Sequence, residues 1–224
     1  FENDCIVIHL TLIPYLTAAG ELKTKPTQHS VKALLELGIQ PDILCCRTEH
    51  ELELNLRKKI AKFCNVSMNA VIEAKDASSI YDVPILMQSE ELDKVVLEKL
   101  GLPKKSSPNL NKWKSFLERL KNPKSEVNVA LIGKYVELKD SYKSISEAFI
   151  HAGVSNETKV NIKWIHSDEI TKSSIKNELK DIDGILVAPG FVSRGISGKI
   201  KAVENARVNE IPFIPDYFAS SDQG

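Results

Sequence analysis

The stretch CIVIHLTLI (residues 5–13), followed by VKALLELG (31–38) and IQPDILCCRT (39–48), decides the fold class. The first and third segments are short runs of apolar and β-branched residues, which is typical of buried strands. The middle segment repeats valine and leucine at helical spacing and stops at Gly38, and Ser30 can cap its start. A strand, a helix and a strand in this order predict a parallel pair with a right-handed crossover.

The same alternation continues to about residue 102. Residues 51–65 are amphipathic and predict a helix, 71–76 predict a strand, and a helix is expected to stop at Gly101. Residues 14–30 carry Gly, Pro, Thr and Ser and are predicted to be a loop. The sequence therefore predicts a first α/β domain over residues 1–102.

A lysine-rich segment with three prolines follows, and it predicts an interdomain linker over residues 103–125 with one helix centred on Trp113. The strand–helix pattern then restarts, which predicts a second α/β domain over residues 126–224. Its expected strands are 127–133, 159–165, 184–189 and 211–214. Its expected helices are 142–153, 175–182 and 199–210.

Composition excludes several classes of protein. Lys+Arg and Asp+Glu both number 30, and this balance argues against a general nucleic-acid or membrane-surface binder. No apolar run reaches the length of a membrane-spanning helix. The four cysteines lack the spacing of a metal site, and reduced thiols in a cytoplasmic protein are expected. The five histidines form no ligand cluster, and no Walker A motif is present.

The loop GELKTKPTQHS (20–30) holds the densest polar chemistry of the first half. Lys23 and Lys25 alternate around Thr24, so an extended backbone would place both ammonium groups on one side. Pro26 is expected to keep Lys25 extended. Two cations, neutral hydrogen-bonding groups and a helix start suit a polyphosphate. The alternative is a solvated loop with a helix cap.

A glycine-rich loop, GFVSRGISG (190–198), follows a predicted buried strand and lies where open α/β sheets place their ligands. Gly190, Gly195 and Gly198 allow positive φ angles and a close approach of a ligand to the backbone. Backbone amides there could stabilise an oxyanion. The alternative is an ordinary turn between a strand and a helix.

Several stretches resemble the CTP synthase family in the same order as in that family. KTKPTQHSV (23–31) is its most specific motif, within a match over residues 9–47, and residues 125–153 and 184–191 resemble its glutaminase domain. The resemblance implies the C-terminal part of a Rossmann-like, P-loop-related synthetase domain with a parallel sheet. It also implies the start of a flavodoxin-like class I glutamine amidotransferase domain. Both α/β domains are expected to be incomplete.

The resemblance also implies a reaction and its site. In the family, ATP phosphorylates O4 of UTP, and ammonia from glutamine then displaces phosphate to give CTP. Magnesium accompanies ATP, CTP inhibits, GTP activates, and a homotetramer places the nucleotide sites between subunits. The residues that match the site for UTP and CTP are Lys23, Thr24, Lys25, Pro26, Thr27, Gln28 and Lys59. Those that match the ATP site are Arg47, Phe63, Lys75, Asp76 and Ala77, and Gly190 and Phe191 match the glutamine site.

The chain also departs from the family pattern. The P-loop and the acidic magnesium ligands are missing, Tyr217 occupies the position of the nucleophilic cysteine, and Val192 replaces a glycine. No catalytic residue and no metal ligand is therefore expected in this chain. One explanation is a longer enzyme whose missing segments have been closed up; we favour it, because a half-sheet would expose strand edges. The other is a truncated, non-catalytic regulatory relative that binds CTP or UTP.

Overall fold

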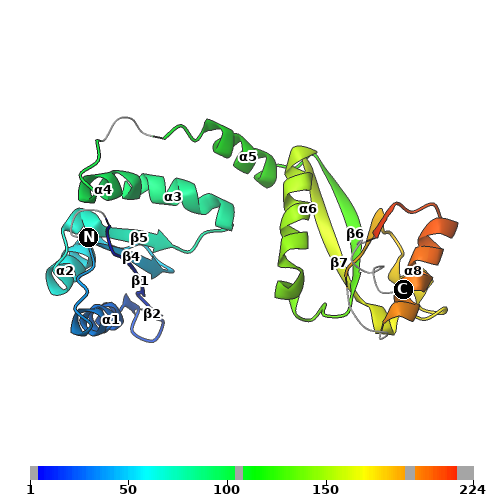
Figure 1. Cartoon of the computed structure of the whole chain (residues 1–224), viewed down its shortest axis with the longest axis horizontal. Helices are drawn as coiled ribbons and strands as arrows, with labels where there is room; N and C mark the ends of the chain where they lie inside the picture. Colours follow the sequence, from blue (N-terminus) through cyan, green and yellow to red (C-terminus); the bar gives the residue numbers. More distant parts are fainter. Residues whose placement is uncertain (1–4, 104–107, 190–194, 216–224) are drawn as a thin grey trace. The chain divides into compact units, whose positions relative to one another are not determined.

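The computed structural model describes residues 5–103, 108–189 and 195–215. The chain divides into two compact units, Phe1–Leu110 and Asn111–Gly224. Each unit is an α/β structure built on a parallel sheet (Figure 1). The predicted fold class is confirmed at this level.

The first unit has a three-stranded parallel sheet in the order β1-β4-β5 and a small antiparallel hairpin, β2–β3. Short 3-10 turns precede β5 and α3, at Met68–Ala70 and Ile80–Asp82. The strands and helices are β1 Ile8–Leu12, β2 Tyr15–Leu16, β3 Glu21–Leu22, α1 Lys25–Glu36, β4 Ile43–Thr48, α2 Leu54–Cys64, β5 Val71–Lys75, α3 Val83–Ser89 and α4 Leu92–Lys99.

Hydrophobic clusters cover the two faces of this sheet separately. On one face α1 and α2 pack on the strands, with Val31, Leu44 and Ile60 fully or almost fully buried. On the other face α3 and α4 pack mainly near β5, against Ile43 and Ile72. Because side chains alternate along a strand, β4 and β5 each contribute to both clusters.

Strand β1 departs from the prediction of a buried strand. Leu10 and Leu12 are 62% and 57% exposed, and Ile8 on the same side of the strand is 46% exposed. Within the described residues β1 pairs with β4 alone, so it is an edge strand. The helices α3 and α4 lie toward β5, at the opposite edge of the sheet, and leave this side of β1 open.

The prediction of a loop over residues 14–30 is wrong in two respects. The hairpin β2–β3 occupies its first part, and α1 begins at Lys25, so Ser30 lies inside the helix and does not cap it. Lys25 is consequently helical and not extended before Pro26. A proline in the first turn removes no intrahelical hydrogen bond, because the amide groups there have no partner in the helix.

The second unit has a four-stranded parallel sheet in the order β7-β6-β8-β9. Short 3-10 turns lie at Lys139–Tyr142 and Ser167–Glu169. The strands and helices are α5 Asn111–Lys121, β6 Ser125–Gly133, α6 Lys143–Ser155, β7 Thr158–His166, α7 Ile175–Glu178, β8 Gly184–Val187, α8 Ile196–Val208 and β9 Phe213–Pro215.

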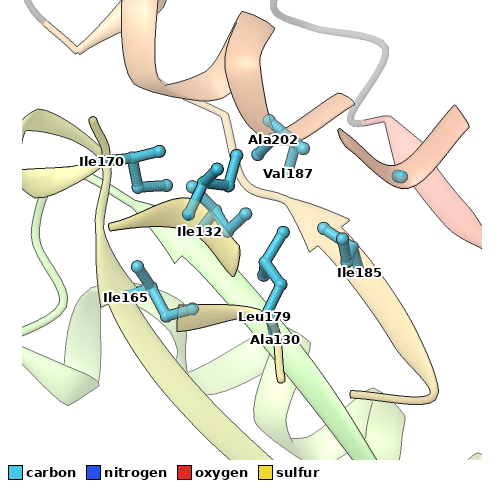
Figure 2. Close-up of a cluster of buried hydrophobic side chains, with 10 residues drawn as sticks. Ala130, Ile132, Ile165, Ile170, Leu179, Ile185, Val187 and Ala202 are labelled. Atoms are coloured by element: carbon cyan, nitrogen blue, oxygen red, sulfur yellow. The ribbon is translucent and has the colours of Figure 1, made fainter. Parts of the chain in front are cut away.

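One cluster of aliphatic side chains forms the core between this sheet and its helices α7 and α8 (Figure 2). Ile132 of β6, Ile165 of β7 and Ile185 of β8 meet there with Ala202 of α8. The helix predicted around Trp113 is α5, which belongs to this unit; its Phe116 contacts His151 of α6, with ring centroids 5.8 Å apart.

Candidate functional site

The carboxyl edge of the first sheet gathers the segments that the sequence singles out. The hairpin and the start of α1 follow β1, Arg47 and Thr48 end β4, Lys75 ends β5, and Asp76 and Ala77 come directly after it. Open α/β sheets bind their ligands at this edge. Two surfaces there are candidates: a basic surface made by Glu21, Lys23 and Lys59, and a groove beside Arg47 and Asp76.

Side-chain hydroxyl groups fix the first turns of α1 to β1. The hydroxyl of Thr11 donates to Thr27 Oγ1 at 3.0 Å, and Thr27 Oγ1 donates to the carbonyl of Leu12 at 3.0 Å. His9 Nε2 and Ser30 Oγ lie 2.8 Å apart one turn further on. Thr27 is fully buried, so its hydroxyl serves packing within the unit.

Thr24 and Gln28 close the amino-terminal end of α1. The amide of the Gln28 side chain donates to Thr24 Oγ1 at 3.1 Å, and its backbone N–H donates to the Thr24 carbonyl at the same distance. Thr24 is buried. Of the predicted nucleotide-binding residues, Thr24 and Thr27 therefore shape the turn, while the exposed side chains of Lys25 and Lys59 face solvent.

The basic surface contains an acidic group. Lys23 forms an ion pair with Glu21, two residues earlier on the hairpin. The hydrogen bond from Lys23 and the charge of Lys23 lower the pKa of Glu21, and the charge of Lys59 on α2 lowers it further. Glu21 is thus paired with Lys23, and the charge of Lys59 also acts on its carboxylate. Lys25 and Lys59 form no ion pair within the described part of the chain.

The groove beside Arg47 has a volume of about 520 Å³. Leu10 and Cys45 line it from the sheet. Arg47 Nη2 lies 2.9 Å from Asp76 Oδ1, in an exposed ion pair at the groove. Apolar walls with a charged pair beside them suit a flat ring that carries polar edges. The remaining residues that line the groove are Ala74, Lys75, Ala77, Ile80, Val83, Leu86 and Met87.

Four of the five residues predicted for ATP, namely Arg47, Lys75, Asp76 and Ala77, therefore line one groove. Phe63 does not. It lies on α2, is 63% exposed, and belongs to the helix that packs on the opposite face of the sheet through Ile60 and Cys64. The structure consequently separates Phe63 from the other four residues.

In the second unit, the predicted glutamine residues Gly190 and Phe191, like Val192, lie outside the described residues. The described neighbourhood is tightly packed. A Cβ atom added at Gly198 would lie 1.7 Å from the carbonyl oxygen of Ser167, and one at Gly195 would lie 2.4 Å from Ser167 Oγ. The first turn of α8 thus fits against the end of β7 only because both residues are glycines.

Two further contacts hold the carboxyl ends of the strands in this unit. The ammonium group of Lys199 on α8 is buried and donates to the carbonyl of Ala188 at 2.7 Å. The hydroxyl oxygen of Tyr142 accepts the backbone N–H of Lys134 at 3.1 Å, just after β6. Both contacts are at the edge where a parallel sheet offers its ligand site.

All four cysteines are free thiols. Burial, followed by the neighbouring Cys45 and Cys64, raises the pKa of Cys46 to about 12. The thiolate is the reactive form, so Cys46 is inert at neutral pH. No group of three or more His, Cys, Asp or Glu side chains that could hold a metal ion occurs in the described residues. Nor does any helix in that part have the length and apolar character needed to cross a membrane.

Sequence reasoning missed Glu21. The signal was present, because residues two apart on an extended segment point to the same side. Glu21 and Lys23 are such a pair. The hairpin that makes this segment extended has strands of two residues each, which leave no periodic pattern to recognise.

Comparison with known families gives two matches along the chain. Residues 1–102 match the family described as CTP synthase N-terminus, and residues 137–214 match glutamine amidotransferase class-I. The chain is similar to the CTP synthase of Cytophaga hutchinsonii, with 65% identity over 211 residues that cover 94% of this chain and 39% of the relative. It is also similar to the CTP synthase of Flavobacterium johnsoniae, with 64% identity over 95% of this chain and 40% of the relative.

The chain therefore spans 39–40% of the length of these curated relatives. A solved structure of the Trypanosoma brucei CTPS glutaminase domain with bound acivicin aligns with 42% of this chain and 37% of that one. The identity is 31% and the TM-score is 0.39, an overlap too small for a comparison of folds.

Proposed function

Because the chain is identified as a CTP synthase sequence, with a synthetase region followed by a glutamine amidotransferase region, we propose that its natural polypeptide converts UTP to CTP. ATP phosphorylates O4 of the uracil ring, ammonia adds at C4, and phosphate leaves. Glutamine hydrolysis in the second region supplies the ammonia. The observation that carries this proposal is the continuous similarity over 94–95% of the chain, in one order, to enzymes of that name.

The basic surface is the proposed site for the triphosphate of UTP and of the inhibitor CTP. Lys23 pairs with Glu21 on this surface, the charge of Lys59 acts on the same carboxylate, and Lys25 opens α1. Hydrogen bonds between ions are about twice as strong as neutral ones, so a few lysines suffice for a polyphosphate. The helix start at Thr24 and Lys25 adds a favourable dipole.

The groove beside Arg47 is the proposed site for the adenine of ATP. Its apolar walls would exclude water from the ring faces, while Arg47, Asp76 and the backbone near Ala77 offer polar partners for the ring edge. Magnesium bound to the phosphates of ATP would neutralise their charge and polarise the transferred phosphoryl group. Its ligands are expected outside this chain.

Other parts of the proposal concern the whole protein. We propose a cytoplasmic homotetramer with nucleotide sites between subunits, and with GTP as an activator. Free thiols at all four cysteines agree with a reducing compartment. The open side of β1 at Leu10 and Leu12 agrees with a neighbour that covers it.

The test uses the natural full-length polypeptide that contains this chain. Purified protein should form CTP from UTP and ATP with either glutamine or ammonia. Lys23→Ala and Lys59→Ala should each raise the KM for UTP by about 10-fold, the loss expected when a charged hydrogen bond is removed. Lys58→Ala, on the adjacent exposed position of α2, is the matched control and should leave the KM unchanged. Absence of CTP with both nitrogen sources would refute the proposal.

A further inference from the structure

The acidic group on the basic surface has no role in the function proposed above. Glu21 is exposed, bears a charge of the same sign as a triphosphate, and pairs with Lys23 of the proposed phosphate site. Its carboxylate is held ionised by Lys23 and by the charge of Lys59. A carboxylate at this position repels the phosphates of a polyanion and therefore weakens its binding.

The hairpin fixes the position of this carboxylate. Glu21 pairs with Leu16 across β2–β3, and the backbone N–H of Lys23 donates to the Pro14 carbonyl at 2.9 Å. The hairpin is also anchored from its other strand, since the rings of Tyr15 and His50 lie 4.0 Å apart between centroids. Glu21 and Lys23 are therefore presented together by a fixed backbone.

We propose that Glu21 is an internal counter-ion that competes with the nucleotide for Lys23. Without a nucleotide it pairs with Lys23 and offsets part of the positive charge of this surface. A nucleoside triphosphate displaces it from Lys23, so each binding event breaks one ion pair and brings two anions close together. Glu21 thereby lowers the affinity for the triphosphate and sets the concentration range in which the site fills.

This inference rests on the proposed nucleotide site and goes further by assigning a residue that tunes its affinity. Exposed ion pairs are weak, so the tuning is modest. It acts through charge and is therefore screened by salt. Both properties distinguish a competing charge from a structural role for Glu21, since loss of the hairpin would weaken binding at every salt concentration.

The experiment measures the dissociation constants of UTP and of inorganic tripolyphosphate for the full-length polypeptide at low and high salt. Glu21→Gln should bind both about 2- to 5-fold more tightly at low salt, the factor that an exposed ion pair supports. The gain should shrink at high salt. Glu21→Ala should behave in the same way. Glu36→Gln, an exposed acid near the other end of α1, is the matched control and should change neither constant.

A double-mutant cycle locates the effect. In the Lys23→Ala background the gain from Glu21→Gln should be smaller, because the pair that it relieves is already absent. Unchanged or weaker binding in Glu21→Gln would overturn the counter-ion role. If Lys23→Ala and Lys59→Ala leave UTP binding intact, the proposed nucleotide site itself fails. The result for Glu21→Gln tests the counter-ion role, and the results for Lys23→Ala and Lys59→Ala test the nucleotide site, so a failure of one proposal can be told from a failure of the other.

Discussion

At Gly198, the first turn of α8 lies so close to the end of β7 that there is no room for a methyl group. A Cβ atom there would lie 1.7 Å from the carbonyl oxygen of Ser167, and the neighbouring Ile170 Cβ would be 3.3 Å away. The carbonyl oxygen of Ser167 and helix α8 are both part of the backbone, so neither can shift to make room for an added side chain without displacing the other. This contact makes residue 198 one of the most constrained positions in the second unit.

Gly198→Ala should destabilise the second unit by at least the ~1–3 kcal/mol typical of overpacked sites. The measurement is the midpoint of urea unfolding, followed by a signal from that unit such as Trp164 fluorescence. Gly184→Ala is the control, because its nearest neighbour would be 3.7 Å away. Equal midpoints for the two variants would show that the close contact does not exist.

Thr27 offers a second test at the level of one side chain. Thr27→Val keeps the shape but leaves the Thr11 hydroxyl and the Leu12 carbonyl without their partner, which should cost about 1–3 kcal/mol. Thr27→Ser keeps the hydroxyl and should cost less. The double variant Thr11→Val with Thr27→Val should be more stable than the sum of the single changes predicts. Strict additivity in denaturant unfolding would contradict the hydrogen-bonded pair.

Residue chemistry alone did not point to the groove beside Arg47. The family resemblance assigned Arg47, Lys75, Asp76 and Ala77 to one site, and the structure gathers these four residues in one groove. Phe63 was assigned with them, but the buried face of α2 directs this helix to the other side of the sheet. A residue's place along the chain does not fix the face of the sheet on which its helix packs.

At the scale of elements, a partly buried cluster joins α2, β5 and the end of α3. Arg57 of α2 donates to both oxygens of Glu90, with 2.9 Å between Nη2 and Oε1, and Nη2 lies 3.3 Å from Glu73 Oε2. The backbone N–H of Glu73 also donates to Glu90, at 2.8 Å. Burial would raise the pKa of Glu90, but the hydrogen bonds from Arg57 and Glu73 outweigh it and hold the pKa below its ordinary value of 4.5.

A depressed folded-state pKa means that Glu90 contributes stability above the unfolded-state pKa and loses this contribution as the pH falls through the folded-state value. Glu90→Gln should therefore be less stable than the parent by about 1.5–3 kcal/mol at neutral pH. The difference should narrow below pH 4.5. The measurement is the free energy of unfolding of both proteins from about pH 3 to 7, a range that brackets the ordinary pKa of a glutamate.

Glu91→Gln is the control for this profile, because Glu91 is exposed and its partner Lys94 lies on the same helix. Its effect should be small over the whole pH range. If the difference in the free energy of unfolding between Glu90→Gln and the parent stays constant in acid, the ionised form of Glu90 does not hold these elements together.

Elements with long apolar runs were predictable, and the short ones were not. The strands expected at 127–133 and 184–189 correspond to β6 and β8, in which residues 130–133, Ile185 and Val187 are buried in a parallel sheet. The hairpin β2–β3 and the early start of α1 were missed. Pro26 was taken as a sign of extended backbone, whereas the buried hydroxyl contacts of Thr27 hold this turn in a helix.

At the scale of the whole molecule, the chain consists of two compact units with separate cores. Ile72 and Ile132, 1% and 0% exposed, belong to different units. We expect the two units to unfold independently. Ile72→Ala should lower the midpoint temperature of one calorimetric transition, and Ile132→Ala should lower that of the other. Each change should reduce the free energy of unfolding of its unit by about 2–5 kcal/mol. Leu37→Ala, at a position that is 76% exposed, should lower neither. A single transition that both variants shift equally would refute independent unfolding.

The uncovered side of β1 has a consequence for how the protein is handled. Leu10 and Leu12 present leucine side chains to solvent on a strand that, among the described residues, has no strand paired along its outer edge. Such an edge can recruit extended peptides of any origin. Protein in which this side of β1 stays uncovered is prone to aggregate, so the soluble yield should fall as the expression temperature and the protein concentration rise. Leu10→Lys should increase the fraction of soluble, monodisperse protein that is recovered.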